Sequence, residues 1–207
     1  MVSWGAGVTY KPRPEGSIYL AYGTSFNPWV DAAATGAGFS TNENAANNPN
    51  LEPEETRNYE AGVKWDAFGG RLSLNGALFR TEKVNARTRN LTSDPFVLEG
   101  RHQVNGVEMS ASGSLSDRWT LIAAYAFMDS EIVASANAAE RDNDLALTPE
   151  HTFSLWTTYQ LPFDVTMGGG AQYMDAVFRN TTNTTAVPSY WLVNGLASYE
   201  VNEHLTL

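Results

Sequence analysis

The sequence predicts an all-β fold: part of an antiparallel transmembrane β-barrel of the outer-membrane type, with about ten strands. Three observations lead to this prediction. Apolar and polar residues alternate over runs of about ten residues, longer than the five or six of an ordinary strand. Tight turns and long polar stretches follow each other in strict alternation. Aromatic residues fall near the ends of the apolar runs, as they do in strands that cross a bilayer between short periplasmic turns and long extracellular loops.

The turns are marked by Gly, Pro, Asn, Asp and Ser, which favour tight reversals of the chain. They fall at residues 11–16, 68–70, 116–118, 161–164 and 201–203. Between them, stretches of small and polar residues predict four long loops, at about 27–55, 86–102, 132–150 and 174–189. Each interval between two turns therefore consists of a strand, a long loop and a return strand.

The alternation also assigns the two faces of the sheet, because successive side chains of a strand point to opposite sides. In residues 56–66, every second residue from Tyr59 to Trp65 is apolar, and we expect these side chains to face lipid: Tyr59, Ala61, Val63 and Trp65. The other parity is small and polar and is expected to line a wet lumen. The charged residues predicted to face this lumen are Glu60, Lys64 and Glu108.

Composition narrows the possible functions. The net charge of -10 argues against a nucleic-acid partner, which needs a basic face. The absence of cysteine excludes disulfides and thiolate metal sites. No apolar run approaches the roughly 18 residues of a membrane-spanning helix. Residues 1–11 have neither a basic nor an apolar segment of a signal peptide, so none is expected.

Several motifs resemble chemical sites but do not match them. A calcium loop starting at Asp142 would need Gly and Glu where Leu147 and Phe153 stand. Glu150 and His151 do not form a zinc-protease motif, and the glycines at 168–170 are expected to mark a bend or close approach in a strand. No catalytic, cofactor or metal site is predicted, and the chain is not expected to be an enzyme.

Cationic side chains gather at or beside the predicted outer loops, although the chain as a whole is acidic. Guanidinium groups suit an anionic ligand, which they hold by charge-assisted hydrogen bonds. The alternative is that these residues contact lipopolysaccharide or neighbouring acids, or hydrogen-bond at strand–loop borders. Aromatic residues of the same loops are candidates for stacking on an aromatic ligand. The candidate ligand residues are Arg87, Arg89, Arg101, His102, Arg179, Phe26, Trp29 and Phe178.

An acidic cluster precedes one of the strands. Glu52, Glu54 and Glu55 are expected to close a long outer loop, with Pro53 blocking early strand pairing and the strand starting at Thr56. The whole stretch 51–66, LEPEETRNYEAGVKWD, resembles the signature L-x-P-E-x-x-x-x-Y-E-x-G-x-K of the barrel of TonB-dependent receptors. Residues that match this signature are Leu51, Pro53, Glu54, Tyr59, Glu60, Gly62 and Lys64.

The resemblance extends over nearly the whole chain. Residues 147–162, LTPEHTFSLWTTYQLP, and the later stretches GGGAQY and VPSYWLVNGLASYEV are similar to catecholate-type siderophore receptors of the Fiu-like group. The resemblance implies a Gram-negative outer-membrane receptor that binds a ferric siderophore in its outer loops and on a plug domain. It also implies energy supplied by TonB through an N-terminal region, and iron that is present only within the siderophore. Outer-membrane lipid and lipopolysaccharide are the expected surroundings.

The resemblance also implies a complete barrel of 22 strands. Residues 1–207 are therefore expected to be one barrel segment, with the plug domain and the last strands absent, and unable to transport alone. Two other interpretations remain open at this point. One is a complete small outer-membrane barrel that acts as a channel or surface protein. The other is a soluble glycan-binding β-sandwich, in which the face formed by Trp119, Leu121, Tyr125 and Phe127 would be packed between two sheets.

Overall fold

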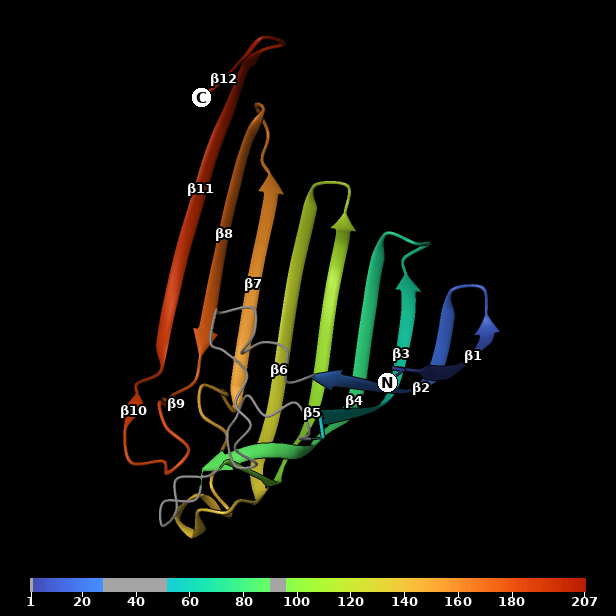
Figure 1. The fold of residues 1–207 in the computed structure, drawn as a ribbon. Coiled ribbons are helices and arrows are strands. Elements are labelled where there is room, and N and C mark those ends of the chain that lie inside the picture. The colour runs from blue at the N-terminus through green and yellow to red at the C-terminus, as the bar shows by residue number, and fades with distance from the viewer. Residues whose placement is uncertain (1, 28–51, 90–95) are drawn as a thin grey trace.

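The computed structural model describes residues 2–27, 52–89 and 96–207, and these form one curved antiparallel sheet (Figure 1). Ten strands follow each other in the order β1-β2-β3-β4-β5-β6-β7-β8-β11-β12, so nearly every strand pairs with its neighbour in sequence. A two-stranded ribbon, β9 and β10, lies in the connection between β8 and β11. Among the described residues, no helix is long and apolar enough to cross a bilayer.

The strands of the large sheet are β1 (Gly5–Arg13), β2 (Gly16–Asn27), β3 (Glu54–Ala67), β4 (Leu72–Arg89), β5 (Phe96–Ser116), β6 (Trp119–Ala134), β7 (His151–Gln160), β8 (Val165–Met174), β11 (Tyr190–Asn202) and β12 (Leu205–Thr206). The ribbon consists of β9 (Val177–Phe178) and β10 (Ala186–Val187). A single 3-10 turn, η1 (Ala138–Glu140), follows β6. The predicted all-β meander of about ten strands is therefore confirmed.

Four turns lie where the sequence predicts them, although the first is narrower, while the last is shifted to Glu203 and His204 because β11 runs to Asn202. Residues 11–13 still belong to β1, and only Pro14 and Glu15 form the reversal. Pro12 is tolerated in β1 because this strand lies at the edge of the described sheet and its pairing shifts between Tyr10 and Arg13. At the second turn, Phe68, Gly69 and Gly70 all have positive φ, which explains the paired glycines.

The predicted loops at 27–55 and 86–102 are too long. Strand β3 starts at Glu54 rather than Thr56, and β4 and β5 remain paired to Arg89 and Phe96. The two other loops are shortened by β6, which runs to Ala134, and by the ribbon of β9 and β10. A strand of 21 residues such as β5 is far longer than the roughly 9–11 that cross a membrane. The extra length projects beyond the bilayer, where both faces are wet and apolar alternation is lost.

Strand pairing confirms the two faces. Residues paired across neighbouring strands share a face, so Ile18, Val63, Met109 and Tyr125 all lie on one side, which we call the apolar face. Side chains of this face are widely exposed, with Leu78 at 60% and Val193 at 73%. Among the described residues the only buried hydrophobic side chains are Leu72, Ala86 and Ile132. A sheet of this length without a central core fits a membrane wall.

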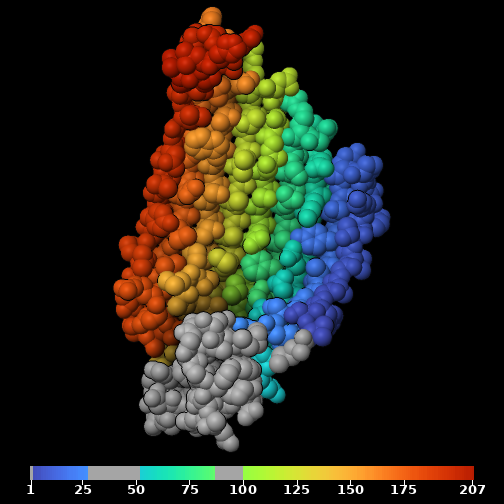
Figure 2. Space-filling model, turned by 45° about the horizontal axis from the view of Figure 1, so that its top comes forward, coloured from blue at the N-terminus to red at the C-terminus, as the bar shows by residue number. Residues whose placement is uncertain are grey.

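Both alternative folds are inconsistent with this sheet. The soluble sandwich would bury Trp119 between two sheets, yet Trp119 is 44% exposed on a single layer. The complete ten-stranded barrel would pair β1 with β11, but in the described residues β1 pairs with β2 while β11 pairs with β8 and β12. Figure 2 shows the two edges, blue and red, on opposite sides of the sheet. The structure is a partial barrel wall.

Two aromatic belts border the apolar face. Near the loop ends, the ring of Trp4 lies beside that of Tyr22 with centroids 5.0 Å apart, and the ring of Tyr173 lies beside that of Trp191 at 4.9 Å; both pairs are tilted. Near the turn ends, Trp119 meets Tyr159 edge-on at 6.4 Å. Residues 119 and 127 of β6 carry the two belts, and eight residues span about 26 Å along a strand. This separation agrees with the apolar band of about 25 Å in outer-membrane barrels.

Glycines on the opposite, polar face make room for large side chains. The ring of Phe79 lies over Gly106, its pairing partner, and Tyr19 lies over Gly62 in the same way. Trp156 covers Gly170, so the glycine run at 168–170 marks a close approach, as the sequence predicts. A Cβ atom at Gly106 would lie 2.7 Å from the carbonyl oxygen of Phe127, a distance that real contacts do not show.

We expect the Gly106→Ala substitution to lower the free energy of unfolding by about 1–3 kcal/mol, because the added methyl overpacks the Phe79 ring and the β6 backbone. The matched control is Gly76→Ala, whose Cβ would have its nearest neighbour, Val63 Cγ1, at 3.7 Å. Urea titration of both variants in lipid vesicles measures the difference. Equal stability of the two variants would contradict the role given to Gly106.

Candidate ligand-binding surface

The polar face carries a hollow of about 520 Å³ whose lining includes Tyr19, Glu60 and Glu108. The Tyr19 hydroxyl donates a hydrogen bond to Glu60 Oε1, and Lys64 Nζ lies 5.5 Å from the centre of the Tyr19 ring. Strand pairing places Glu60, Lys64 and Glu108 on this face, opposite the apolar one. The hollow thus combines an acidic surface with an aromatic rim and small residues.

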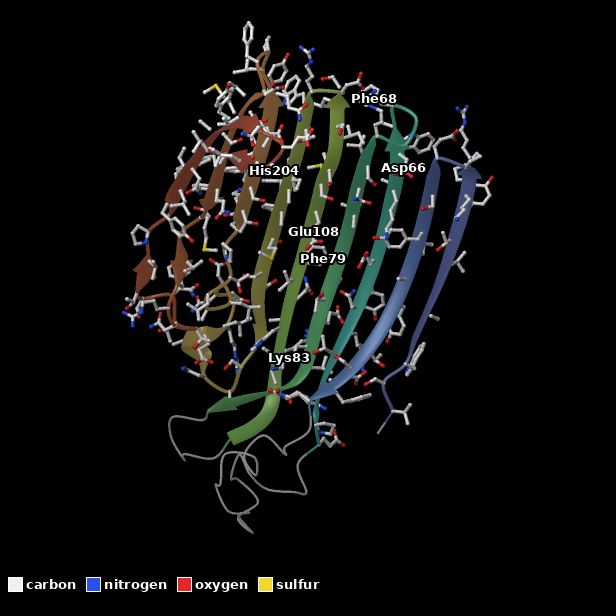
Figure 3. All side chains as sticks on the ribbon, turned by 90° about the horizontal axis from the view of Figure 1, so that it is seen from above. Asp66, Phe68, Phe79, Lys83, Glu108 and His204 are labelled. Atoms are coloured by element: carbon white, nitrogen blue, oxygen red, sulfur yellow. The ribbon has the colours of Figure 1, made fainter. Side chains whose placement is uncertain are left out.

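The position of this hollow along the strands follows from Figure 3. Asp66 and Phe68 lie at the turn end of the sheet, Lys83 lies at the loop end, and Phe79 and Glu108 lie between them. Lys83 therefore marks the region where the strands leave the membrane, which we call the outer lobe. It comprises the loop ends of β2 to β6 together with residues 135–150 and 175–189.

The outer lobe holds a partly buried ion pair. Lys83 Nζ lies 2.9 Å from Glu54 Oε2, and the Glu54 side chain is only 9% exposed. Asn27 Nδ2 donates to the same oxygen at 2.9 Å, which joins β2 to β3. The acidic cluster therefore does more than close a loop: Glu54 is a strand residue that fixes the start of β3, and Glu55 forms an ion pair with Arg57 at 2.9 Å.

His102 lies beside this pair, because it is the pairing partner of Lys83. Burial, together with the charge of Lys83, lowers the pKa of His102, while Glu54 and Glu140 act in the opposite direction. His102 lies in the part of β5 that extends past the outer aromatic belt, five residues beyond Val107, the pairing partner of Phe127. The folded outer lobe thus favours the neutral imidazole.

A lowered pKa makes the stability of the outer lobe dependent on pH. Below the ordinary histidine pKa of about 6.5 the unfolded chain takes up the proton more readily than the folded one. Stability is therefore fully present above about pH 6.5 and is lost as the pH falls towards the folded-state pKa. We expect His102→Gln to reduce this acid-dependent loss, measured as the change in melting temperature between pH 7.5 and pH 5, and an unchanged difference would contradict it.

Two outer segments are joined by a network of hydrogen bonds. Asn143 Nδ2 donates to the carbonyl of Thr181 at 3.0 Å, and Thr181 Oγ1 donates to Glu140 Oε1 at 2.8 Å. The Asp144 amide donates to Asn183 Oδ1 at 2.8 Å, and Asn183 Nδ2 returns a bond to the Asp144 carbonyl at 3.0 Å. Residues 135–150 and 175–189 therefore form one platform that is joined by hydrogen bonds. The sequence shows only Asn- and Thr-rich polarity here, and no spacing in it predicts these contacts.

The predicted ligand residues are distributed around this platform. His102 lies within electrostatic reach of Glu140, and Arg179 and Phe178 lie on the second segment of the platform, with Arg179 exposed and Phe178 partly buried. Arg101 is exposed and pairs with Ala134 at the end of β6. The structure thus brings Arg101, His102, Phe178 and Arg179 to the outer lobe.

The structure does not place the side chains of the other predicted ligand residues with these four residues. Phe26 pairs with Glu55 and has the parity of Tyr22, so it lies on the side of the apolar face. Trp29 lies outside the described residues. The backbone of Arg87 and Arg89 is at the end of β4, but their side chains lie outside the described part of the chain.

A meandering antiparallel sheet with lipid-facing aromatic belts, a polar opposite face and long strand extensions defines the wall of an outer-membrane β-barrel. A protein-family model described as TonB dependent receptor-like, beta-barrel, matches residues 1–207. The chain therefore belongs to the β-barrel family of TonB-dependent receptors, which are Gram-negative outer-membrane proteins.

Individual relatives are similar in sequence to this chain over all or nearly all of its length. The probable TonB-dependent siderophore receptor PiuA of Acinetobacter baumannii is 34% identical, over 100% of this chain and 29% of its own length. The catecholate siderophore receptor Fiu of Escherichia coli is 30% identical, over 99% of this chain and 27% of its own length. The chain spans less than a third of the length of these relatives.

Solved structures agree with the sequence comparison. The crystal structure of the siderophore receptor PiuA from Acinetobacter baumannii superimposes with a TM-score of 0.86 at 34% identity, over 97% of this chain and 30% of that one. The closed form of the ferric-catecholate import receptor Fiu from K12 E. coli superimposes with a TM-score of 0.83 at 27% identity, over 97% of this chain and 29% of that one. The observed sheet is therefore a continuous section of such a barrel.

Proposed function

We propose that this chain is part of the barrel of an outer-membrane receptor that takes up a ferric siderophore of the catecholate class with energy from TonB. The observation that carries the proposal is the similarity, over the full chain, to proteins named as siderophore receptors, including a catecholate one. On this proposal the protein is a transporter and not an enzyme. Iron enters as part of the siderophore and is a substrate, so no resident cofactor is assigned.

The outer lobe supports a role in ligand capture. A ferric catecholate complex is anionic and aromatic, and Arg101 and Arg179 offer exposed guanidinium groups to its oxygens. Phe178 lies next to Arg179, where a ring can stack on a catechol. His102 and the two arginines at the end of β4, Arg87 and Arg89, belong to the same proposal.

The platform gives these groups a defined geometry. Because residues 135–150 and 175–189 are tied by hydrogen bonds from Asn143 and Asn183, the backbone that carries Phe178 and Arg179 is ordered before a ligand arrives. Less conformational entropy is then lost on binding. On the other side, the apolar face and its aromatic belts meet outer-membrane lipid, and the exposed arginines lie at the height of lipopolysaccharide.

Uptake of iron tests this function. The protein in its full natural length would be produced in cells that lack their own siderophore receptors, and transport of radioactive iron bound to a catecholate or a hydroxamate would be compared. We expect transport of the ferric catecholate, and its loss in cells without TonB. Transport of the hydroxamate complex alone would contradict the assigned substrate class, and transport that persists without TonB would contradict the mechanism.

A further inference from the structure

We propose that Glu150, His151 and Asp175 form a binding site for a divalent transition-metal ion of the zinc type at the loop ends of β7 and β8. Their potential ligand atoms, one from each residue, all lie within 4.8 Å of one another. Glu150 Oε1 is 3.8 Å from His151 Nε2. Among the side chains that the structure describes, this is the one group of three or more such residues. Nothing in the transport of a siderophore requires it.

The backbone holds the three residues in place. The Met128 amide donates to the Glu150 carbonyl at 2.8 Å, and the Asp175 amide donates to the His151 carbonyl at 3.0 Å. His151 itself is the pairing partner of Phe127 in the sheet. The site is therefore anchored to β6, β7 and β8, and does not depend on the order of a free loop.

Neighbouring side chains orient the imidazole. The Tyr125 hydroxyl forms a hydrogen bond of 2.9 Å with His151 Nδ1, and the rings of Tyr125 and Phe127 lie 6.1 and 5.2 Å from the imidazole ring. With Nδ1 engaged, Nε2 is the nitrogen turned towards Glu150. A hydrogen bond to the second ring nitrogen is the usual way in which proteins fix a metal-binding histidine.

The Asp175 carboxylate is oriented in the same way. Its Oδ1 accepts hydrogen bonds from the Ala176 amide at 2.8 Å and from the Tyr173 hydroxyl at 3.1 Å, and its Oδ2 has no hydrogen bond among those of the described residues. Glu150 is exposed, so its carboxylate is able to turn towards a cation. The oriented imidazole of His151, the oriented carboxylate of Asp175 and the movable carboxylate of Glu150 together provide three ligands of a metal coordination shell.

The ligand types select the metal. Carboxylates alone favour calcium or magnesium, whereas an imidazole nitrogen favours zinc, nickel and cobalt. Because a metal ion binds carboxylate and imidazole ligands in their deprotonated forms, a divalent ion would balance the charge of about -2 that such a ligand set carries. Three protein ligands leave one tetrahedral position for water or another outer ligand. A bound ion would join the ends of β7 and β8 at the base of the platform, to which Glu150 and Asp175 belong.

Metal binding is measured directly, without any siderophore. The protein in its full natural length would be titrated with Zn²⁺ by calorimetry, and with Co²⁺ by its visible absorption. We expect one ion per chain, with binding reduced at least tenfold by Asp175→Asn, and by about 10–100-fold by Tyr125→Phe, which removes only the orienting hydroxyl. The matched control is His204→Ala, which removes an exposed histidine of the β11–β12 turn and should leave binding unchanged.

Each outcome decides the proposal. Stoichiometric binding that is sensitive to Asp175 and Tyr125 but not to His204 supports the site, and a tetrahedral Co²⁺ spectrum would identify its geometry. No binding of Zn²⁺ at 100 µM by the wild-type protein overturns it and leaves an ordinary His151–Glu150 pair. Binding that only His204→Ala abolishes also overturns it. Because the readout contains no siderophore, these results are separate from those of the uptake experiment.

Discussion

Replacing Lys83 with methionine is expected to lower the free energy of unfolding by about 2 kcal/mol. Breaking a buried ion pair from one side costs about 3–5 kcal/mol, because the remaining charge stays desolvated. Lys83 is 36% exposed, so solvent screening reduces that figure. Glu54, at 9% exposure, keeps the hydrogen bond from Asn27 but loses the ammonium group at 2.9 Å. Urea titration in lipid vesicles measures the change.

A double-mutant cycle isolates the pair itself. Glu54→Gln removes the carboxylate charge while retaining its shape, so adding it to Lys83→Met should restore part of the lost stability. The coupling energy is expected to exceed about 1 kcal/mol. Purely additive effects of the two substitutions would show that the ion pair does not hold the loop end of β3 against β4.

Replacing Arg101 and Arg179 together with alanine is expected to weaken the binding of a ferric catecholate by about 100-fold or more. Hydrogen bonds to charged groups contribute about 1.5–3 kcal/mol, and each 1.4 kcal/mol is tenfold in affinity. Both side chains are exposed on the outer lobe, where nothing in the described structure needs their charge for folding. Binding is measured by fluorescence quenching of the protein in its full natural length.

The matched control for the arginines is Arg118→Ala, an exposed arginine in the turn between β5 and β6 at the opposite end of the sheet. Its affinity should equal that of the unmodified protein. The same expectation of weaker binding applies to the pair Arg87→Ala and Arg89→Ala. An unchanged affinity in either outer pair would remove that pair from the ligand site, while an equal loss in Arg118→Ala would indicate a general effect of charge.

The sequence predicts those parts of the fold that the membrane determines. Within the bilayer one face of the sheet must be apolar, so the alternation of apolar residues reveals the face on which residues such as Val63 and Tyr125 lie. Outside it, both faces are wet and the pattern disappears. Residues 86–89 therefore look like a loop, although Ala86 pairs with Gly100 and Thr88 with Val97. The positive φ of Asn85 marks the irregularity that precedes this extension.

The outer lobe is the part that sequence reasoning describes least. Arg101, His102 and Arg179 are found by charge and position, but the contacts that fix their surroundings are long-range. Glu54 meets Lys83 across 29 residues, and Thr181 meets Glu140 across 41 residues. Polar side chains of this kind carry no periodic signal, so only the folded strands show which of them lie together. The sequence also does not show that the residues of the proposed metal site lie together, because Asp175 follows His151 by 24 residues.

The orientation of the sheet in the outer membrane tests the account most directly. The 207 residues contain no cysteine, so single cysteines can be placed at Leu78 and Val193, on the apolar face, and at Ala77 and Asn194, on the polar face. They would carry spin labels in the protein of full natural length, in which any cysteine outside these 207 residues is first replaced by serine. In lipid vesicles, labels at 78 and 193 should be accessible to oxygen, and labels at 77 and 194 should be shielded from lipid. Equal lipid accessibility of the two sets would contradict the assignment of this chain to a barrel wall.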